Sequence, residues 1–299
     1  MHYRTAWIGV MLMLAATLTA PKTAQPATAG RAKKHLLVVT VTKGFRHDSI
    51  PVAEQTIEML GNKTGEWDTD FVRTDEEMQE KMTPAALSHY DAVVFANTTG
   101  VLPLPDPQGF LDYIKAGHGF AAMHSGSDTF HTWPGQNGGV SAYVEMLGGE
   151  FETHHSQTAI DAHILDPNAP ETKPLVRAGA EARPGNGDLH EHTQAQDHIW
   201  KVFDEIYLLK NNDPSRLHVL LYLDHHPNDG SADANKPGIH LVSWVKPYGH
   251  GRVFYTILGH RQEVWRDPLY QAHIAGGIAY VLGLARGSLK PNMPSAALK

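Results

Sequence analysis

Short apolar runs alternate with amphipathic segments along the first 130 residues. The runs 35–42 and 91–97 are continuously apolar, which is typical of strands buried on both faces of a parallel sheet. The segments 49–61 and 107–117 are predicted helices, because each has a proline near its start and a glycine at its end. Further elements predicted here are a strand over 67–74, a helix over 83–89 and a strand over 119–124. This alternation predicts an α/β fold with a doubly wound, mostly parallel sheet flanked by helices.

The second half is less regular. Apolar runs predict strands over 155–164, 204–210 and 217–224. The stretch 240–258 contains two such runs around the turn KPYGHG, which predicts an antiparallel C-terminal extension of the sheet. A closing helix is expected over 268–287, where the pair Gly276-Gly277 indicates close packing.

The first residues are similar to a secretory leader. Arg4 precedes an apolar run from Ala6 to Leu18, and small residues follow at 27–29. The run is too short for a confident membrane span. We therefore predict a signal peptide over 1–29, one domain over 30–288 and a C-terminal tail over 289–299, with a periplasmic or secreted location and no membrane attachment after cleavage.

Composition narrows the classes of function. Cleavage after Ala29 removes two cations, so the formal charge of −7 becomes about −9, which argues against a nucleic-acid partner. The chain has no cysteine, which excludes a thiol nucleophile and a thiolate metal site. Its 20 histidines are acid-base groups or metal ligands at neutral pH. No nucleotide cofactor is predicted, and a homo-oligomer stays open.

Polar residues follow the predicted strands. In open α/β sheets ligands bind outside the carboxyl ends of the strands. The segments that leave the predicted strands are 43–47, 97–100, 124–128, 224–226 and 259–261, and four of these five contain histidine. A single polar strand end is ordinary, but convergence of several predicts one site that includes His124.

Several segments resemble one family. VTKGFRHDSIP, YDAVVFANTTG, GHGFAAMHSGSDTFHTWPG and YGHGRVFYTILGHRQEVWRDPLYQAHIAGGIAY are similar to sequences of the ThuA-like family, which is associated with trehalose utilisation and carbohydrate catabolism. The similar segments run in order from about residue 35 to residue 284. The resemblance implies a flavodoxin-like fold related to that of class I glutamine amidotransferases.

The turn after the strand over 119–124 departs from the amidotransferase pattern. In those relatives it resembles G-x-C-x-G and carries the catalytic cysteine, whereas here it reads Met123-His124-Ser125-Gly126. Without a thiolate the acyl intermediate of glutamine hydrolysis cannot form, so the chain is not a glutamine amidotransferase. His124 is therefore expected to act as a metal ligand or a general base.

Candidate site residues share a position after or near a predicted strand end. The candidates for acid-base catalysis are His124, His47, Asp128, Glu205 and His260. The candidates for substrate binding are Arg46, Asn97, His131, Trp133 and Arg261. The candidates for binding a divalent metal, with zinc expected, are His124, His155 and Glu205.

Some of these choices have alternatives. Neighbouring histidines on an extended chain point to opposite sides, and of His154 and His155 we favour His155 as the inward one. Glu205 is expected at the start of a strand, either as a functional carboxylate or as a charge that caps local backbone. His190 and His192 have the spacing of a metal pair but lie in a predicted solvated loop.

These features, with the resemblance, imply an exported enzyme that acts on a small carbohydrate. The resemblance points to a glycoside or a 3-keto-glycoside, processed by histidine and carboxylate acid-base chemistry with metal assistance, in a hydrolase, lyase or isomerase reaction. A non-catalytic sugar-binding accessory protein and a metal-dependent hydrolase of another substrate class are the alternatives. An enzyme is favoured because ionisable groups outnumber aromatic residues at the strand ends.

Overall fold

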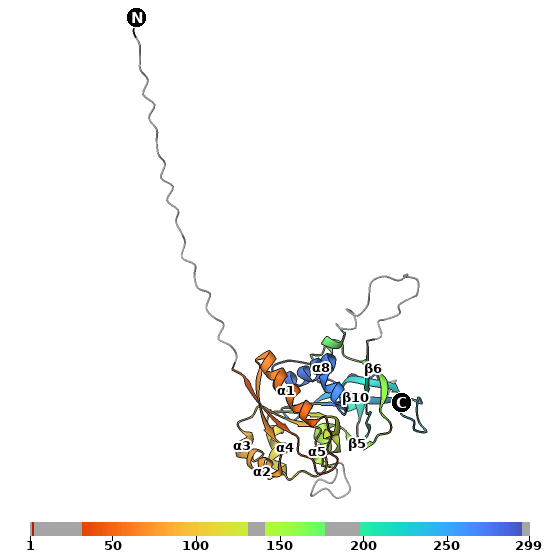
Figure 1. Cartoon of the computed structure of the whole chain (residues 1–299), viewed down its shortest axis with the longest axis horizontal. Helices are drawn as coiled ribbons and strands as arrows, with labels where there is room; N and C mark the ends of the chain where they lie inside the picture. Colours follow the sequence, from red (N-terminus) through yellow and green to blue (C-terminus); the bar gives the residue numbers. More distant parts are fainter. Residues whose placement is uncertain (1, 3–31, 131–140, 177–197, 295–299) are drawn as a thin grey trace. The chain divides into compact units, whose positions relative to one another are not determined.

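A nine-stranded mixed sheet organises the folded part of the chain (Figure 1). The computed structural model describes residue 2 and residues 32–130, 141–176 and 198–294, and Ala32–Lys299 forms one compact unit. Across the sheet the parallel strands are, in order, β2 (Trp67–Val72), β1 (Lys34–Val39), β3 (Ala92–Ala96), β4 (Gly119–Met123) and β11 (Gly251–Thr256). The sheet continues through the antiparallel strands β10 (Pro237–Tyr248), β9 (His218–His225), β6 (Thr158–Ile164) and β7 (Ile199–Asp204).

The helices follow the strands as a doubly wound fold requires. They are α1 (Ile50–Thr64), α2 (Asp75–Lys81), α3 (Pro84–Leu87), α4 (Pro107–Lys115), α5 (Ala142–Leu147), α7 (Gln262–Arg266) and α8 (Pro268–Val281), with 3₁₀ turns η1 (His124–Asp128) and η2 (Pro214–Arg216). Strands β5 (Glu150–Thr153) and β8 (Leu208–Lys210) form a small second sheet. The strand order of the parallel part is that of flavodoxin-like proteins, so the predicted fold class is confirmed.

The parallel strands are apolar because both of their faces are covered. Every residue of β3 and β4 is buried. Helix α8 packs against β11 so closely that a Cβ on Gly277 would lie 2.3 Å from the ring of Phe254. A Cβ on Gly276 would lie 2.4 Å from the carbonyl oxygen of Pro170. The glycine pair thus permits the close packing that the sequence indicates.

Helix α1 is longer than predicted, and Gly61 is not its end. The helix continues to Thr64, and Gly65 ends it in a left-handed conformation with φ of 70°. Gly61 instead faces strand β2, where a Cβ would lie 2.5 Å from Nε1 of Trp67. Ser49 stands at the N-cap position without a side-chain cap hydrogen bond, and its hydroxyl bonds to the carbonyl of Gly259 at 3.3 Å.

The strand predicted over 204–210 is wrong as a single element. Asp204 ends β7, Leu208 begins β8, and Glu205 lies in the connection between them. The reason is a change of sheet: β7 pairs with β6, whereas β8 pairs with β5. Glu205 therefore follows a strand end rather than opening a strand, which places it with the other polar strand ends.

The C-terminal tail is packed at its beginning. The side chain of Asn292 donates to the carbonyl of Val219 and accepts from its amide, and the imidazole of His218 bonds to the carbonyl of Lys290. Several predicted features lie outside the described residues: the leader over 1–29, the candidates His131 and Trp133, and the pair His190 and His192. None of the described helices combines the length and the apolar character needed to cross a bilayer.

Candidate functional site

Four side chains from distant segments meet at the carboxyl end of the parallel strands. His47 follows β1, His124 follows β4, Glu205 follows β7 and His260 follows β11. One ligand atom of each lies within 4.8 Å of the others, and we call these four residues the His–Glu cluster. The structure therefore brings together three histidines that the sequence places after strand ends and Glu205, which the sequence predicts at the start of a strand.

His124 occupies a tight turn between β4 and η1. Its φ of 49° lies in the left-handed region, which costs most residues about 1 kcal/mol or more. Its Nδ1 lies 2.8 Å from the carbonyl oxygen of Ile257, and because a carbonyl only accepts, Nδ1 carries the proton. Its Nε2 atom is therefore directed into the cluster. The hydroxyl of Tyr255 donates to the His124 carbonyl at 2.7 Å and fixes the turn.

His47 faces His124 across the cluster. The Nε2 atoms of the two rings are 3.1 Å apart, and Nδ1 of His47 lies 3.3 Å from the hydroxyl of Ser125. Burial, followed by the proximity of His124 and His260, lowers the pKa of His47 to about 3. His47 is therefore uncharged at neutral pH, and its Nε2 atom faces that of His124 either as a hydrogen-bond donor or as a ligand for a cation between the two rings.

Glu205 is the anionic member of the cluster. Its Oε2 lies 3.1 Å from Nδ1 of His260 and 3.5 Å from Nε2 of His124. Burial opposes ionisation, but the contacts with these two imidazoles outweigh it and hold the Glu205 pKa well below its usual range. Burial also works against the imidazolium of His260, yet the Glu205 carboxylate raises the pKa of that ring. Although Nδ1 of His260 lies 3.1 Å from Oε2 of Glu205, the contact does not have hydrogen-bond geometry. This buried nitrogen therefore makes no hydrogen bond with any described residue.

Asp204 positions the segment that carries His260. This fully buried carboxylate accepts the backbone amides of Gly259, His260 and Arg261 at 2.7, 3.3 and 3.2 Å. Burial raises the pKa of Asp204, although the nearby His124 and the amide of Gly259 oppose the rise. Three amides on one carboxylate fix the backbone, so Asp204 determines where the His260 ring lies.

His154, not His155, reaches the cluster. Nδ1 of His154 lies 3.1 Å from Oε1 of Glu205, whereas His155 is exposed. The expectation that His155 points inward is wrong, because β5 ends at Thr153 and the strand alternation does not continue through the pair. Tyr207 supports this side of the site: its ring centre lies 4.1 Å from that of His124 and 5.9 Å from that of His154.

Asn97 and Asp128 do not belong to the cluster. Asn97 adopts a φ of 55°, and its amide donates to the carbonyl of Gly259 at 2.9 Å and to the hydroxyl of Ser49 at 3.1 Å, so it braces the backbone next to His260. Asp128 ends η1, and its backbone carbonyl accepts from Gly100.

The two candidate arginines bond elsewhere than to the cluster. Arg46 is exposed and donates to the carbonyl of Thr40 at 3.0 Å. Arg261 donates to Gln157 at 2.6 Å and pairs with Glu263 at 3.2 Å. Its guanidinium also lies 5.2 Å from the ring centre of Phe203. Both arginines are therefore held by neighbouring protein groups.

The cluster fits a divalent metal ion. Three imidazoles and one carboxylate are a donor set that zinc and related ions accept. Ligand atoms around a tetrahedral zinc lie roughly 3.4 Å apart, as its bond lengths require. Three of the separations within the cluster, 3.1, 3.1 and 3.5 Å, are close to that value, and all four ligand atoms lie within 4.8 Å of one another. The carbonyl of Ile257 and the hydroxyl of Ser125 are suitably placed to orient two of the rings.

A flavodoxin-like α/β sheet with a histidine and carboxylate cluster at its carboxyl edge defines the class of this protein. Residues 35–281 match the family model described as trehalose utilisation, ThuA. The chain belongs to the ThuA family.

Solved structures agree on the fold. A ThuA-like protein from Parabacteroides merdae ATCC 43184 is 16% identical, with a TM-score of 0.60 over 87% of this chain and 95% of that chain. A ThuA-like protein from Bacteroides uniformis ATCC 8492 is 18% identical, with a TM-score of 0.57 over 86% of this chain and 95% of that chain. At such identities the likeness concerns the fold alone. No match was found among curated protein sequences.

Proposed function

We propose that this ThuA-family chain is an exported enzyme that processes a small carbohydrate, a glycoside or a 3-keto-glycoside, at the His–Glu cluster. The observation that carries the proposal is the convergence of His47, His124, Glu205 and His260 with their nitrogen and oxygen atoms within 4.8 Å. Buried, ionisable groups of this kind are concentrated at functional sites. In the proposed enzyme the cluster holds a divalent ion, with zinc the first candidate.

The bound ion would supply positive charge beside a substrate oxygen, which favours proton loss from the neighbouring carbon or attack at a carbonyl. The chain's own residues hold this charge in place: Glu205 supplies the single carboxylate, and His47 and His124 contribute uncharged rings. Ile257 and Asp204 keep two of the rings in position through the backbone contacts described above.

His154 is the proton carrier in this proposal. Both atoms that face its Nδ1 are acceptors, Oε1 of Glu205 at 3.1 Å and the carbonyl of His155 at 3.2 Å, so Nδ1 carries the proton. Its Nε2 then offers a lone pair for a substrate proton. The His154 side chain is 44% exposed, which allows it to exchange that proton with solvent.

The first experiment measures metal content. The purified chain is dialysed and analysed for bound metals, beside Glu205→Gln, His154→Gln and the exposed-histidine control His89→Ala. We expect about one divalent ion per chain in the native protein, His154→Gln and the control, and loss of most of it in Glu205→Gln, because the amide gives up the only negative charge among the ligands. Native protein without a metal after reloading with zinc would contradict metal assistance.

The second experiment measures turnover of glycosides and 3-keto-glycosides with and without a chelator. We expect turnover that the chelator abolishes, and a decrease of about 100-fold or more in His154→Gln with its metal retained, as for loss of a general base. Turnover that is unchanged by the chelator and unchanged in His154→Gln would contradict this mechanism.

A sugar-binding accessory protein is a second candidate, favoured by Phe45. Its ring is 66% exposed and stands edge-on to His47 with ring centres 4.8 Å apart, a position from which it can stack on a sugar. Sugar binding that Phe45→Ala abolishes, without turnover of any substrate tested, would favour this candidate over the enzyme.

A further inference from the structure

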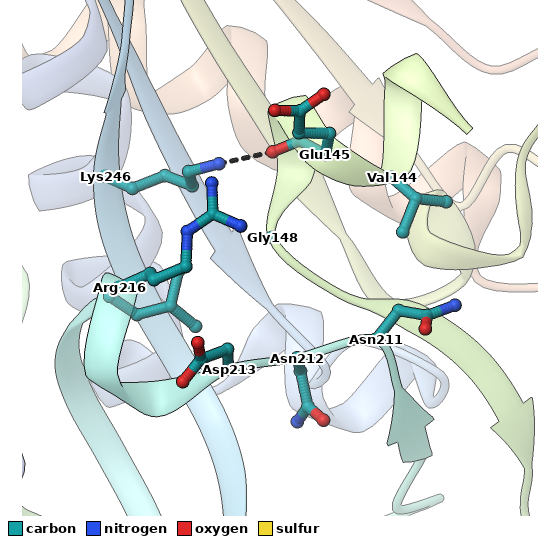
Figure 2. Close-up of a pocket in the computed structure, with 9 residues that line it drawn as sticks. Val144, Glu145, Gly148, Asn211, Asn212, Asp213, Arg216 and Lys246 are labelled. Carbon is teal, nitrogen blue, oxygen red and sulfur yellow. Dashed lines mark hydrogen bonds between the residues drawn. The ribbon is translucent and has the colours of Figure 1, made fainter. Parts of the chain in front are cut away.

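A pocket lies apart from the His–Glu cluster (Figure 2). Its volume is about 510 Å³, and it opens between α5, the turn that leads into η2, and strand β10. The residues that line it are Val144, Glu145, Gly148, Asn211, Asn212, Asp213, Arg216, Leu217 and Lys246. None of them belongs to the cluster, so this pocket would bind its ligand independently of the chemistry proposed above.

Two cationic side chains point toward each other at one end of this pocket. The ammonium of Lys246 and the guanidinium of Arg216 converge in Figure 2. Lys246 is only 8% exposed, and its ammonium donates to the backbone carbonyl of Glu145. The backbone amide of Arg216 donates to the carbonyl of Asp213 at 3.0 Å, but its guanidinium makes no hydrogen bond or ion pair with the residues that the structure describes. Two positively charged groups thus lie close together with no carboxylate between them.

The acidic residues of the pocket are directed elsewhere. The carboxylate of Asp213 accepts the amide of Ser215 at 2.9 Å and its hydroxyl at 2.6 Å. Glu145 is exposed, and its carboxylate points away from the Lys246 ammonium in Figure 2. The Lys246 ammonium therefore has no neighbouring carboxylate that balances its charge. Burial and the positive charge of Arg216 lower the pKa of Lys246 to about 8, although the charge of Glu145 opposes this decrease.

The rest of the lining is suited to a small organic molecule. A Cβ on Gly148 would lie 2.9 Å from Leu217 and 3.1 Å from the Lys246 stem, so the glycine allows these two side chains to pack against the backbone beside the cations. Val144 and Leu217 add apolar surface, and Asn211 and Asn212 complete the lining. The Asn211 amide donates to the Glu150 carboxylate at 2.7 Å, and both asparagine side chains point away from the cations in Figure 2. Apolar surface with a few polar groups is typical of small-molecule sites.

We propose that this pocket binds a small carbohydrate that carries an oxyanion, a carboxylate or a phosphate ester, with the oxyanion between Arg216 and Lys246. A forked guanidinium and an ammonium together match the geometry and the charge of such a group. The carbon skeleton of the ligand would lie over Gly148 and Leu217.

Calorimetric titration of the full chain tests this site. The probes are glucuronate, glucose 6-phosphate and the neutral control glucose, each at up to about 10 mM, the range in which weak sites are still measurable. We expect binding of glucuronate or of glucose 6-phosphate, which distinguishes the carboxylate from the phosphate, and no binding of glucose. Arg216→Gln should weaken binding about tenfold or more, as the loss of a charge-assisted hydrogen bond implies.

The matched control is Lys201→Met, which removes one positive charge from an exposed position on β7 and should leave binding unchanged. Since Arg216 is exposed, its variant should fold, and a melting curve verifies this. Absence of binding for both anionic probes, equal binding of glucose, or unchanged affinity in Arg216→Gln would each overturn the proposal.

Proton uptake provides a second readout that a merely structural Lys246 would not give. An anion beside the ammonium raises its pKa, so binding at about pH 8.5 should take up a fraction of a proton, and binding at about pH 6.5 almost none. Titrations in two buffers of different ionisation enthalpy measure this uptake. Binding without uptake at the higher pH, or uptake that persists in Lys246→Met, would overturn the assignment of Lys246.

Discussion

His124 combines an unfavourable backbone conformation with a fully buried side chain. Its left-handed φ of 49° turns the chain directly after β4, so the imidazole stands over the carboxyl edge of the sheet. Strain of this kind is retained where the surrounding structure enforces it, here through Tyr255 and Ile257. A sharp turn thus presents a ring nitrogen at the carboxyl edge of the sheet.

Replacing His124 tests the centre of the site directly. In His124→Ala we expect loss of most of the bound metal and a decrease in turnover of about 100-fold or more against a verified substrate. Metal analysis and steady-state kinetics measure both, and a circular dichroism spectrum verifies the fold. His89→Ala, an exposed histidine without a role in the site, should match the native protein. Native metal content and activity in His124→Ala would make His124 a structural residue.

Asp204 should act on the site only through His260. In Asp204→Asn one acceptor oxygen is replaced by a donor that faces the amides of Gly259 to Arg261, so the segment should shift. We expect metal affinity to fall about 10-fold to 100-fold, as for other residues that orient a ligand. Competition with a chromogenic chelator measures this. Asp161→Asn, an exposed Asp-to-Asn change on β6, should leave the affinity unchanged.

At the scale of elements, the sequence predicts the strands of the parallel sheet, because their continuous burial gives continuous apolar runs. Strands β3 and β4 are buried throughout, and β1 and β11 are buried along most of their length, so the polar residues that follow these strands could be placed at one edge. The positions of Glu205 and His154 near the site depend on which strands pair with each other, and a single sequence does not show this pairing. Glu205 lies between two strands because β7 and β8 join different sheets, and the choice of His154 over His155 depends on where β5 ends.

The contact between α1 and β2 predicts that Gly61→Ala destabilises the protein, although helix propensity alone would predict stabilisation. In an open helix, Gly→Ala stabilises by roughly 0.5–1 kcal/mol. At Gly61 the new Cβ would lie 2.5 Å from Nε1 of Trp67, so we expect Gly61→Ala to destabilise the protein by about 1–3 kcal/mol. Urea unfolding measures the difference. Asn62→Ala, at the adjacent exposed position, should be neutral or stabilising, and a stabilised Gly61→Ala would contradict the packing described.

At the scale of the whole molecule, one buried carboxyl should make stability depend on pH. Glu171 is 1% exposed, and neither carboxyl oxygen has a hydrogen-bond partner among the described residues. Burial raises its pKa from 4.5 to about 7, although the nearby backbone amide of Glu171 itself opposes the rise. The folded state therefore keeps a proton that the unfolded state releases, so this stability is complete below about pH 4.5 and is lost as the pH rises through about 7.

Glu171→Gln removes this dependence. Between about pH 5 and pH 8 the variant should gain roughly 2–3 kcal/mol relative to the native protein, since a pKa unit corresponds to about 1.4 kcal/mol. Urea unfolding at both pH values measures the change. Glu58→Gln, an exposed carboxylate on α1, should show no such gain, and a difference between native protein and Glu171→Gln that is the same at both pH values would contradict the shifted pKa.

The place of β11 in the sheet also bears on how the chain folds during synthesis. Strand β4 pairs with β3 on one side and with β11 on the other, yet Gly119 and Arg252, which are paired in register, are separated by more than a hundred residues. Until residues 251–256 leave the ribosome, β4 is an unprotected sheet edge and His124 lacks the Ile257 carbonyl. Such distant pairing is slow to form, so the nascent chain should stay loosely folded until synthesis is nearly complete. A fragment that ends at residue 236 should accordingly aggregate rather than fold.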